Sequence, residues 1–489
     1  MKDKKISNNL VYSLLIQISG LIAPLITSPY IARVLSPELI GDYSFTLANS
    51  NYFTLIECLG LPLYGMIEAA KVRDDKKKLS KLFWEISLIK IFLTIICVIV
   101  YVGMFVCSGN QNLRHLYIIM IFNLIAVGLD TTWILNGLEE FKVTAIRSIA
   151  VRIINIFLIL LFVKSEHDII TYALIMQGST FISYAVMFPT VLKKIGEISL
   201  KELNIWRHIK PSLIYFVPGI ITTIFQSTDK SILGIFSTSY EVGVYEQACK
   251  ICQLFACMIS AVSNAILPRA AYLNSNTEKN SESEKLFKTS IRICSFAALP
   301  ICFGASAIAD SFIPVFFGAG YEKSAVLLKI LCINVFFIAL SNFYGQQALM
   351  ARGKQKEYNI SITVSAFANV AINLVLVQSL ESVGVSIASA VAGLISFLMI
   401  SYYGKDMLPL PAAIKMSHKY LAAAVLMFIC IFKIVFNSNY LTVLVQIISG
   451  VLIYFAVLIV LKEKIVISVL ERIRNKQLGK VHDNNNSKK

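Results

Sequence analysis

The chain has 489 residues, of which 56% are hydrophobic and 15% are charged, and its formal net charge is +16. A soluble protein of this length would carry roughly 25% charged residues, so the composition excludes an ordinary soluble protein and indicates that lipid surrounds most of the chain. The basic residues lie in gaps between apolar runs, which favours the anionic inner face of a membrane over nucleic acid as their partner.

Long apolar stretches follow one another along most of the chain. A helix that spans a membrane needs about 20 mainly apolar residues, and fourteen stretches meet this length. They occupy residues 9–34, 40–67, 83–106, 115–137, 143–163, 168–191, 209–236, 242–270, 287–309, 324–350, 357–378, 383–403, 418–436 and 440–461. The first stretch lacks a small-residue cleavage site and is predicted to be an uncleaved span. Because the connections are short, no soluble domain is expected.

Lys and Arg are unevenly distributed among the connections, and this asymmetry predicts the orientation. Alternate connections are rich in basic residues: 71–81, 193–210, 278–288, 351–357 and 404–419. The other connections hold Arg114, Lys164 and Lys323. Since basic loops stay in the cytoplasm, both termini are predicted to be cytoplasmic and the number of spans to be even. Twelve spans would give the same parity, so only hydropathy favours fourteen.

Two similar motifs indicate an internal repeat. "ELIGDYSF" (38–45) opens the second stretch and "YEVGVYEQ" (240–247) opens the eighth, and a looser echo relates residues 133–148 to residues 347–362. The expected fold is an all-α polytopic membrane protein with fourteen transmembrane helices. Its predicted parts are an N-terminal six-helix lobe (1–200), a C-terminal six-helix lobe (201–410), two peripheral helices (411–465) and a basic, partly disordered cytoplasmic tail (466–489).

Prolines occur in the first helix of each predicted lobe, at Pro24 and Pro29 in one and at Pro211 and Pro218 in the other. A proline frees a backbone carbonyl and allows a helix to bend. Lipid cannot satisfy that carbonyl, so a neighbouring helix or water must. We predict that these prolines are hinges of helices that open one side of the protein while closing the other. A static kink that only improves packing is the alternative.

Charged residues inside the spans are costly, so they usually face a wet interior or a partner. The candidates for a central cavity are Arg33, Arg147, Arg152, Asp229, Lys230, Glu246 and Lys250. Glu246 and Lys250 are four residues apart, share a helix face and can pair. Such a cavity, with both signs and a cationic excess, would suit an anionic head group. Structural ion pairs for Arg147 and Arg152, and snorkelling to the outer head groups for Arg33, are the alternatives.

No motif supports catalysis or a cofactor. The sequence has no G-x-S-x-G motif, no phosphate-binding loop and no pair of histidines at metal-binding spacing. Cys249 and Cys252 form a C-x-x-C without a second pair or a nearby histidine, so no metal or redox role is predicted. A membrane enzyme is disfavoured because every loop is short. We therefore predict a transporter without cofactor or metal, which draws on an H+ or Na+ gradient, the membrane potential or the substrate's own gradient.

Several segments resemble a family of bacterial polysaccharide flippases. "SPYIARVLSPELIGDYSF" (28–45) followed by "GLPLYGMIEAAKVRDDKKKLSKLF" (60–83) resembles the start of the Wzx-type lipid-linked oligosaccharide translocases, in the multidrug/oligosaccharidyl-lipid/polysaccharide exporter superfamily. "QSTDKSILGIFSTSYEVGVYEQACKI" (226–251) is similar to that family's seventh and eighth helices, and "IPVFFGAGYEKSAVLLKIL" (313–331) to its ninth-to-tenth junction. The resemblance covers nearly the whole chain and is specific to the family, not to a substrate.

The resemblance implies a V-shaped bundle of two six-helix lobes around a cationic cavity, plus two peripheral helices, in the bacterial inner membrane. The implied substrate is an undecaprenyl-diphosphate-linked oligosaccharide, turned to the outer leaflet by alternating access during O-antigen, lipopolysaccharide or capsule biosynthesis. Membrane lipids, a coupling ion, a polysaccharide polymerase and a chain-length regulator are the candidate partners. A cation-coupled drug or metabolite antiporter of the same superfamily is the alternative function.

Carried onto this chain, the family pattern assigns Arg33 to the arginine that closes the first-helix motif. Asp229 and Lys230 match the acidic–basic pair of the seventh helix, and Gly243 and Tyr245 match the entry to the eighth.

One departure lies near the end of the second stretch. The family often has Gly-small-Arg-Glu there, whereas this chain has Gly65-Met66-Ile67-Glu68. Without that arginine a substrate role for this turn is in doubt, and Glu68 lacks its usual neighbour. Lys71 and Arg73 are the candidates to replace it.

Overall fold

A computed structural model describes residues 2–196, 198–274, 280–463 and 466–467; for 2–10, 14, 200, 218, 261–274 and 280–281 only the backbone is described. All regular structure in these residues is helical, which confirms the predicted all-α class. The predicted tail 466–489 lies almost entirely outside the described residues.

The chain forms two compact units, which are described separately. Unit 1 contains residues 1–250, 317–321 and 366–388, and unit 2 contains residues 251–316, 322–365 and 389–489. The helices of unit 1 are α1 (Lys2–Val34), α2 (Pro37–Cys58), α3 (Leu61–Lys71), α4 (Lys76–Tyr101), α5 (Arg114–Leu129), α6 (Thr132–Gly137), α7 (Phe141–Phe162), α8 (Ile169–Leu192), α9 (Ile209–Thr223) and α10 (Asp229–Phe236).

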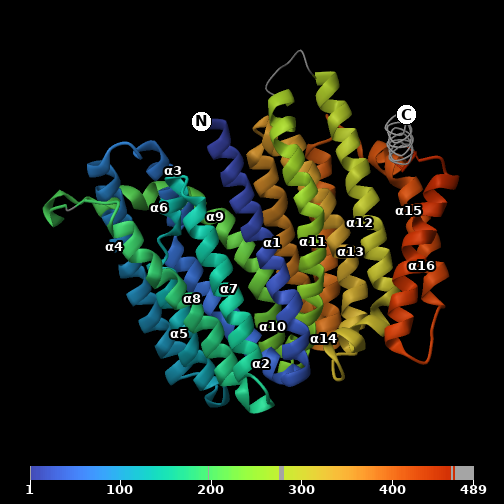
Figure 1. The fold of residues 1–489 in the computed structure, drawn as a ribbon, viewed down its shortest axis with the longest axis horizontal. Coiled ribbons are helices and arrows are strands. Elements are labelled where there is room, and N and C mark those ends of the chain that lie inside the picture. The colour runs from blue at the N-terminus through green and yellow to red at the C-terminus, as the bar shows by residue number, and fades with distance from the viewer. Residues whose placement is uncertain (1, 197, 275–279, 464–465, 468–489) are drawn as a thin grey trace, which may run out of the picture. The chain divides into compact units, whose positions relative to one another are not determined.

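Two long helices have parts in both units, and unit 2 contains four further helices. The shared ones are α11 (Ser239–Asn274) and α14 (Gln355–Tyr403). Those of unit 2 are α12 (Asn280–Phe317, whose last residue belongs to unit 1), α13 (Lys323–Tyr344), α15 (Leu410–Phe432) and α16 (Asn439–Val460). Within unit 1, α1 packs along α7 and α5 packs along α8 (Figure 1).

Local sequence explains where several helices begin and end. Ser36 caps α2, since its hydroxyl accepts a hydrogen bond from the Leu39 N–H at 3.5 Å, and Pro37 follows at the first helical position. Asp75 caps α4 by accepting from the Lys78 N–H at 3.0 Å, and this bond lowers the pKa of the Asp75 carboxyl.

Gly60 is required at the turn between α2 and α3. Its φ is +72°, a left-handed conformation that side chains disfavour. A Cβ there would lie 2.3 Å from the carbonyl oxygen of Ser212, so α9 passes directly against this turn. The two helices otherwise form one apolar element, Pro37–Lys71, which corresponds to the predicted span 40–67.

Fewer than fourteen spans can be counted on the described residues. Eleven helices are long and apolar enough to cross a membrane, or twelve if one bent pair forms a single span. The predicted count of fourteen is therefore not confirmed. One of the eleven is the 49-residue α14, which contains Glu381 at φ 49° and ψ −130°, a backbone conformation at which two helices meet. The predicted spans 357–378 and 383–403 lie on either side of this residue.

The bent pair begins before α9 and ends with α10. The segments Ile205–Val217 and Gly219–Phe236 meet at 45°, so the break lies at position 218, where the sequence has a proline. The side chain of Pro218 is outside the described residues. Pro211 lies in the first turn of α9, where its missing N–H costs no helical hydrogen bond.

The prolines of α1 do not interrupt that helix. Pro24 and Pro29 both lie inside it, and it is helical from Lys2 to Val34. That the four prolines act as hinges stays a prediction, because a single conformation does not show movement.

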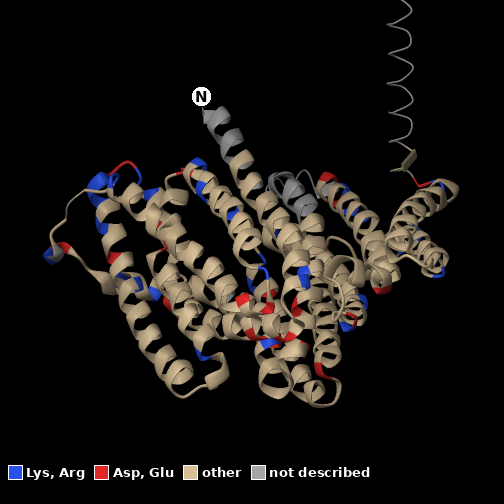
Figure 2. Cartoon of the chain, turned by 60° about the horizontal axis from the view of Figure 1, so that its bottom comes forward, with Lys and Arg blue, Asp and Glu red and all other residues tan. Residues whose placement is uncertain are grey.

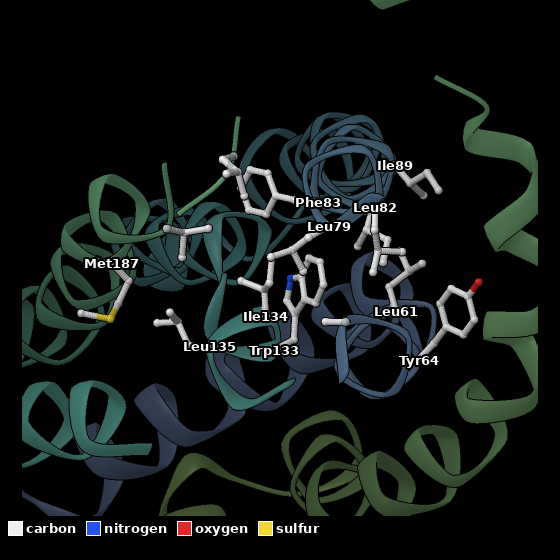
Figure 3. Packing of buried hydrophobic residues seen from close by; sticks show 14 residues of the cluster. Leu61, Tyr64, Leu79, Leu82, Phe83, Ile89, Trp133, Ile134, Leu135 and Met187 are labelled. Carbon is white, nitrogen blue, oxygen red and sulfur yellow. The ribbon is translucent and has the colours of Figure 1, made fainter. Parts of the chain in front are cut away.

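Each unit has an apolar core. In unit 1, Trp133 stacks on Phe83 with ring centroids 6.2 Å apart, and Leu61, Ile134 and neighbours from α4 and α8 surround them (Figure 3). In unit 2 the core joins α12 to the terminal pair α15 and α16, around Tyr420, Met427 and Tyr454.

Candidate functional site

Three charged side chains form a network between α10 and α11 in unit 1. The ammonium of Lys230 lies 2.5 Å from one carboxylate oxygen of Glu246, and the ammonium of Lys250 lies 3.7 Å from the other. The pairing of Glu246 with Lys250 follows from their spacing of four residues. Because one carboxylate lies between two ammonium groups, the three side chains together carry a net positive charge.

Asp229 is adjacent to Lys230 in sequence but has different partners. Its side chain is only 5% exposed. Tyr245 on α11 donates its hydroxyl to Oδ2 at 2.5 Å, and Asn373 on α14 donates its amide to Oδ1 at 2.6 Å. The amide of Asn373 also lies 3.3 Å from the side-chain oxygen of Asn369. Donors on two other helices thus stabilise the buried carboxylate.

The two repeated motifs meet each other through their glycines. A Cβ on Gly41 would lie 1.8 Å from the carbonyl oxygen of Ser239, and a Cβ on Gly243 would lie 1.9 Å from that of Pro37. Each carbonyl belongs to the residue four positions before the opposite glycine, so the contact is reciprocal. The Ser239 hydroxyl also donates to the Asp42 carboxylate. This Gly41–Gly243 crossing joins the first turns of α2 and α11.

The tyrosines of the same motifs are also equivalent. Tyr43 follows Gly41 by two residues and accepts a hydrogen bond from the Gln177 amide at 2.8 Å. Tyr245 follows Gly243 by two residues and donates to Asp229. Each buried hydroxyl therefore ties the second helix of its predicted repeat to another helix.

The three candidate arginines contact different parts of the protein. Arg152 is bound to α1, where its guanidinium donates to the Ile16 carbonyl at 2.5 Å and to the Ser19 hydroxyl. Arg147 lies 5.1 Å over the ring of Tyr184, and its Nε and Nη1 are buried without a hydrogen-bond partner among the described residues.

Arg33 lies at the end of α1 and is exposed. A Cβ on Gly318 would lie 3.2 Å from its Cγ, so the stem of the arginine packs against that glycine. The structure thus brings together Asp229, Lys230, Glu246 and Lys250, whereas Arg33, Arg147 and Arg152 each have separate surroundings.

Sequence reasoning missed the amides that complete the site, and it did not group a second set of buried charges. Asn369 and Asn373 are four apart on α14, a spacing that could have identified them as one polar face in an apolar helix. Glu57 on α2 is fully buried, and neither of its oxygens has a hydrogen-bond partner among the described residues. Lys90 is 1% exposed and donates to the Asp130 carbonyl at 2.7 Å.

At the departure from the family pattern, Lys71 is the residue next to Glu68. Its ammonium lies 2.7 Å from Glu68, whereas Arg73 instead bonds Glu139 at 3.1 Å. Among the residues that the structure describes, no group of three or more His, Cys, Asp or Glu could hold a metal, and Cys249 and Cys252 are both free thiols.

Solved structures share this fold. The lipid II flippase MurJ in an inward closed conformation has a TM-score of 0.68 and 15% identity, over 94% of this chain and 99% of that one. The MATE multidrug transporter DinF-BH has a TM-score of 0.53 and 16% identity, over 80% of this chain and 93% of that one. At such identities the likeness shows the fold alone: the chain is a multi-pass membrane protein with the MurJ/MATE-like helical fold.

Sequence comparison identifies the family, which structural likeness alone does not. The model of the family described as "Polysaccharide biosynthesis protein" matches residues 6–274, more than half of the chain, so the protein belongs to that family. A putative O-antigen transporter of Escherichia coli K12 is 26% identical over 411 residues, which is 82% of this chain and 98% of that protein. A probable low-salt glycan biosynthesis flippase, Agl15 of Haloferax volcanii, is 23% identical over 202 residues, which is 41% of each.

Proposed function

We propose that the chain is a flippase, not an enzyme, which moves a lipid-linked oligosaccharide from the cytoplasmic to the outer leaflet of the bacterial inner membrane. Membership in the polysaccharide biosynthesis family, with a relative named as an O-antigen transporter that matches over nearly its whole length, is the observation that carries this proposal. The substrate is proposed to be an undecaprenyl-diphosphate-linked repeat unit, used for O-antigen or capsule.

The charge network supports a substrate with a diphosphate head group. Lys230 and Lys250 share one carboxylate, so positive charge remains for an anion. The unpartnered donors of Arg147 point to a second site for a phosphate or sugar oxygen. Arg152 already bonds two oxygens of α1, so we propose that it holds helices together, and that Arg33 contacts phosphate late in transport.

Alternating access is the proposed mechanism. The Gly41–Gly243 crossing has no room for a side chain, which suits a contact that closes one end of the pathway in one conformation. We propose fourteen spans, with both termini in the cytoplasm and lobes at residues 1–200 and 201–410. The coupling ion, H+ or Na+, and the partnership with a polymerase and a chain-length regulator are also part of the proposal.

Deletion of the gene in its host tests the function. The expected result is loss of surface polysaccharide with accumulation of the lipid-linked repeat unit at the inner leaflet, restored by a plasmid copy of the wild-type chain. Unchanged export in a strain without a second flippase would refute the proposal.

A cation-coupled drug or metabolite antiporter is the alternative, since MATE multidrug transporters share the fold. It would require the deletion strain to become drug-sensitive while its polysaccharide stays normal.

A further inference from the structure

The connection between α8 and α9 is bound to α4 along its length. Near its start, the Gly196 N–H donates to the Ser80 hydroxyl at 2.7 Å. Further on, the carboxylate of Glu202 lies 3.2 Å from the ammonium of Lys77. Figure 2 shows Lys and Arg concentrated at this end of unit 1. A connection that only joined two lobes would need none of these contacts.

The strongest contact of this connection is made by a single carboxylate of α4. Glu85 is 0% exposed and accepts bonds from the Asn204 N–H at 2.7 Å, from Nε and Nη2 of Arg207 at 3.1 and 2.5 Å, and from His208 Nε2 at 2.7 Å. All of these donors come from residues 204–208. Five consecutive residues therefore supply all of these hydrogen bonds to the buried carboxylate. We call this arrangement the Glu85 clamp.

A third helix completes the Glu85 clamp. With Nε2 of His208 donating to Glu85, Nδ1 accepts from the hydroxyl of Tyr64 on α3 at 2.9 Å. His208 is itself 3% exposed and immediately precedes Ile209, the first residue of α9. The start of α9 is thus attached to both α3 and α4.

The next part of the same element is built differently. The bend of 45° lies only ten positions after His208, at position 218, where the proline of the sequence cannot donate a helical hydrogen bond. A π-helical turn, Ile224–Thr228, follows before α10. Such breaks are where a helix changes direction most easily, whereas release of Glu85 would break four hydrogen bonds to one carboxylate.

We infer that the Glu85 clamp stays closed throughout transport, so that the start of α9 is a fixed point on α3 and α4 and only the part beyond the bend moves. This rests on the proposed flippase function. Glu85 and His208 are positioning residues, because they hold the moving helix and do not contact the substrate. The opposite view is that the connection detaches in each cycle and acts as a lid.

A designed disulfide separates these two views. A Cβ on Gly196 would lie 3.7 Å from the Ser80 hydroxyl oxygen without a clash, so cysteines at these two positions would lie next to each other. The variant S80C/G196C is made in a background that lacks the ten native cysteines and is oxidised with copper phenanthroline. Export of newly made glycan is then followed by pulse labelling in the deletion strain.

The fixed-point view predicts that the cross-linked protein exports at the rate of the reduced protein. In the matched control D42C/S239C, a disulfide across the Gly41–Gly243 crossing arrests export. Arrest by S80C/G196C would overturn the inference, and so would failure of this pair to cross-link. If the wild-type chain did not restore export at all, the proposed function itself would fail, so the two failures are distinguishable.

Loss of the carboxylate provides a second test. Glu85→Gln lowers export several-fold because Arg207 and His208 lose their anion, while Glu202→Gln, which removes an exposed carboxylate from the same connection, leaves it unchanged. The disulfide S80C/G196C should restore export to Glu85→Gln, since it replaces the lost attachment. A purely folding role of Glu85 predicts that export falls only in proportion to the amount of Glu85→Gln protein in the membrane, and full export by Glu85→Gln alone would also refute the inference.

Discussion

A single methyl group at Gly41 should disturb the contact between the two repeats. In Gly41→Ala the new Cβ would lie 1.8 Å from the Ser239 carbonyl oxygen and 3.0 Å from the Gly243 nitrogen. Both neighbours are backbone atoms, so no side chain can turn away and the two helices must separate. Overpacking of this kind costs about 1–3 kcal/mol, which corresponds to a shift of about 5–150-fold against the conformation that contains the contact.

Labelling of a nearby thiol measures this shift. Ser44 is buried on α2, one turn after Gly41. In a cysteine-free background, S44C should react with a membrane-impermeant maleimide about 5–150-fold faster when Gly41→Ala is present, in line with the calculated destabilisation. Gly178→Ala is the matched control, since a Cβ at that helical glycine would have no atom within 4 Å. Equal labelling rates in Gly41→Ala and Gly178→Ala would refute the reasoning.

Three further substitutions address the other polar groups. Glu57→Met should maintain or raise the melting temperature in detergent, because an apolar side chain replaces a buried carboxylate that has no hydrogen-bond partner among the described residues. A lower melting temperature would show that the carboxylate is paired. Asp229→Asn should lower the free energy of unfolding by about 1–3 kcal/mol, since one oxygen that accepts a hydrogen bond is replaced by an NH2 group that faces another donor. Chemical denaturation measures this loss, and Tyr245→Phe, which removes only one of the two hydrogen bonds, is the comparison. Arg33→Gln, at equal membrane abundance, should reduce export, and full export would exclude a phosphate contact.

The sequence predicted those parts of the molecule that depend on local composition. Apolar length located most of the helices, and the repeated Gly-x-Tyr motif pointed to two residues that meet as equivalents, Gly41 and Gly243. The spacing of Glu246 and Lys250 gave their shared face. In each case the information lies within a few residues along the chain.

Contacts that join distant segments were not predictable in the same way. Glu85 looks like a charge in an apolar helix, and its role depends on residues about 120 positions later. Asn373 binds Asp229 across 144 positions, and an amide in an apolar helix has many potential partners until the fold selects one. The non-helical backbone at Glu381 lies between the predicted spans 357–378 and 383–403, but hydropathy does not contain its conformation.

The network of Lys230, Glu246 and Lys250 could be a structural ion pair or part of a substrate site. Substitutions of the two lysines distinguish these roles. Glu246 is mostly buried, and its contact with Lys230, at 2.5 Å, is shorter than that with Lys250, at 3.7 Å. If the network only stabilises the fold, Lys230→Met should cost about 2–5 kcal/mol, because it removes the main partner of a buried carboxylate. Lys250→Met should cost about 1 kcal/mol or less, since a longer contact is lost and Lys230 still pairs with Glu246.

Export should not follow that order if Lys250 also binds the substrate. The two lysines are similarly exposed, but Lys250 lies 3.7 Å from Glu246 whereas Lys230 lies 2.5 Å from it, so Lys250 is the lysine that is held less closely and can turn to a diphosphate. Lys250→Met should therefore reduce export strongly while the melting temperature changes little, and Lys250→Arg should restore it because the cation is retained. Parallel losses of export and stability across Lys230→Met, Lys250→Met and Lys250→Arg would show instead that the network is structural.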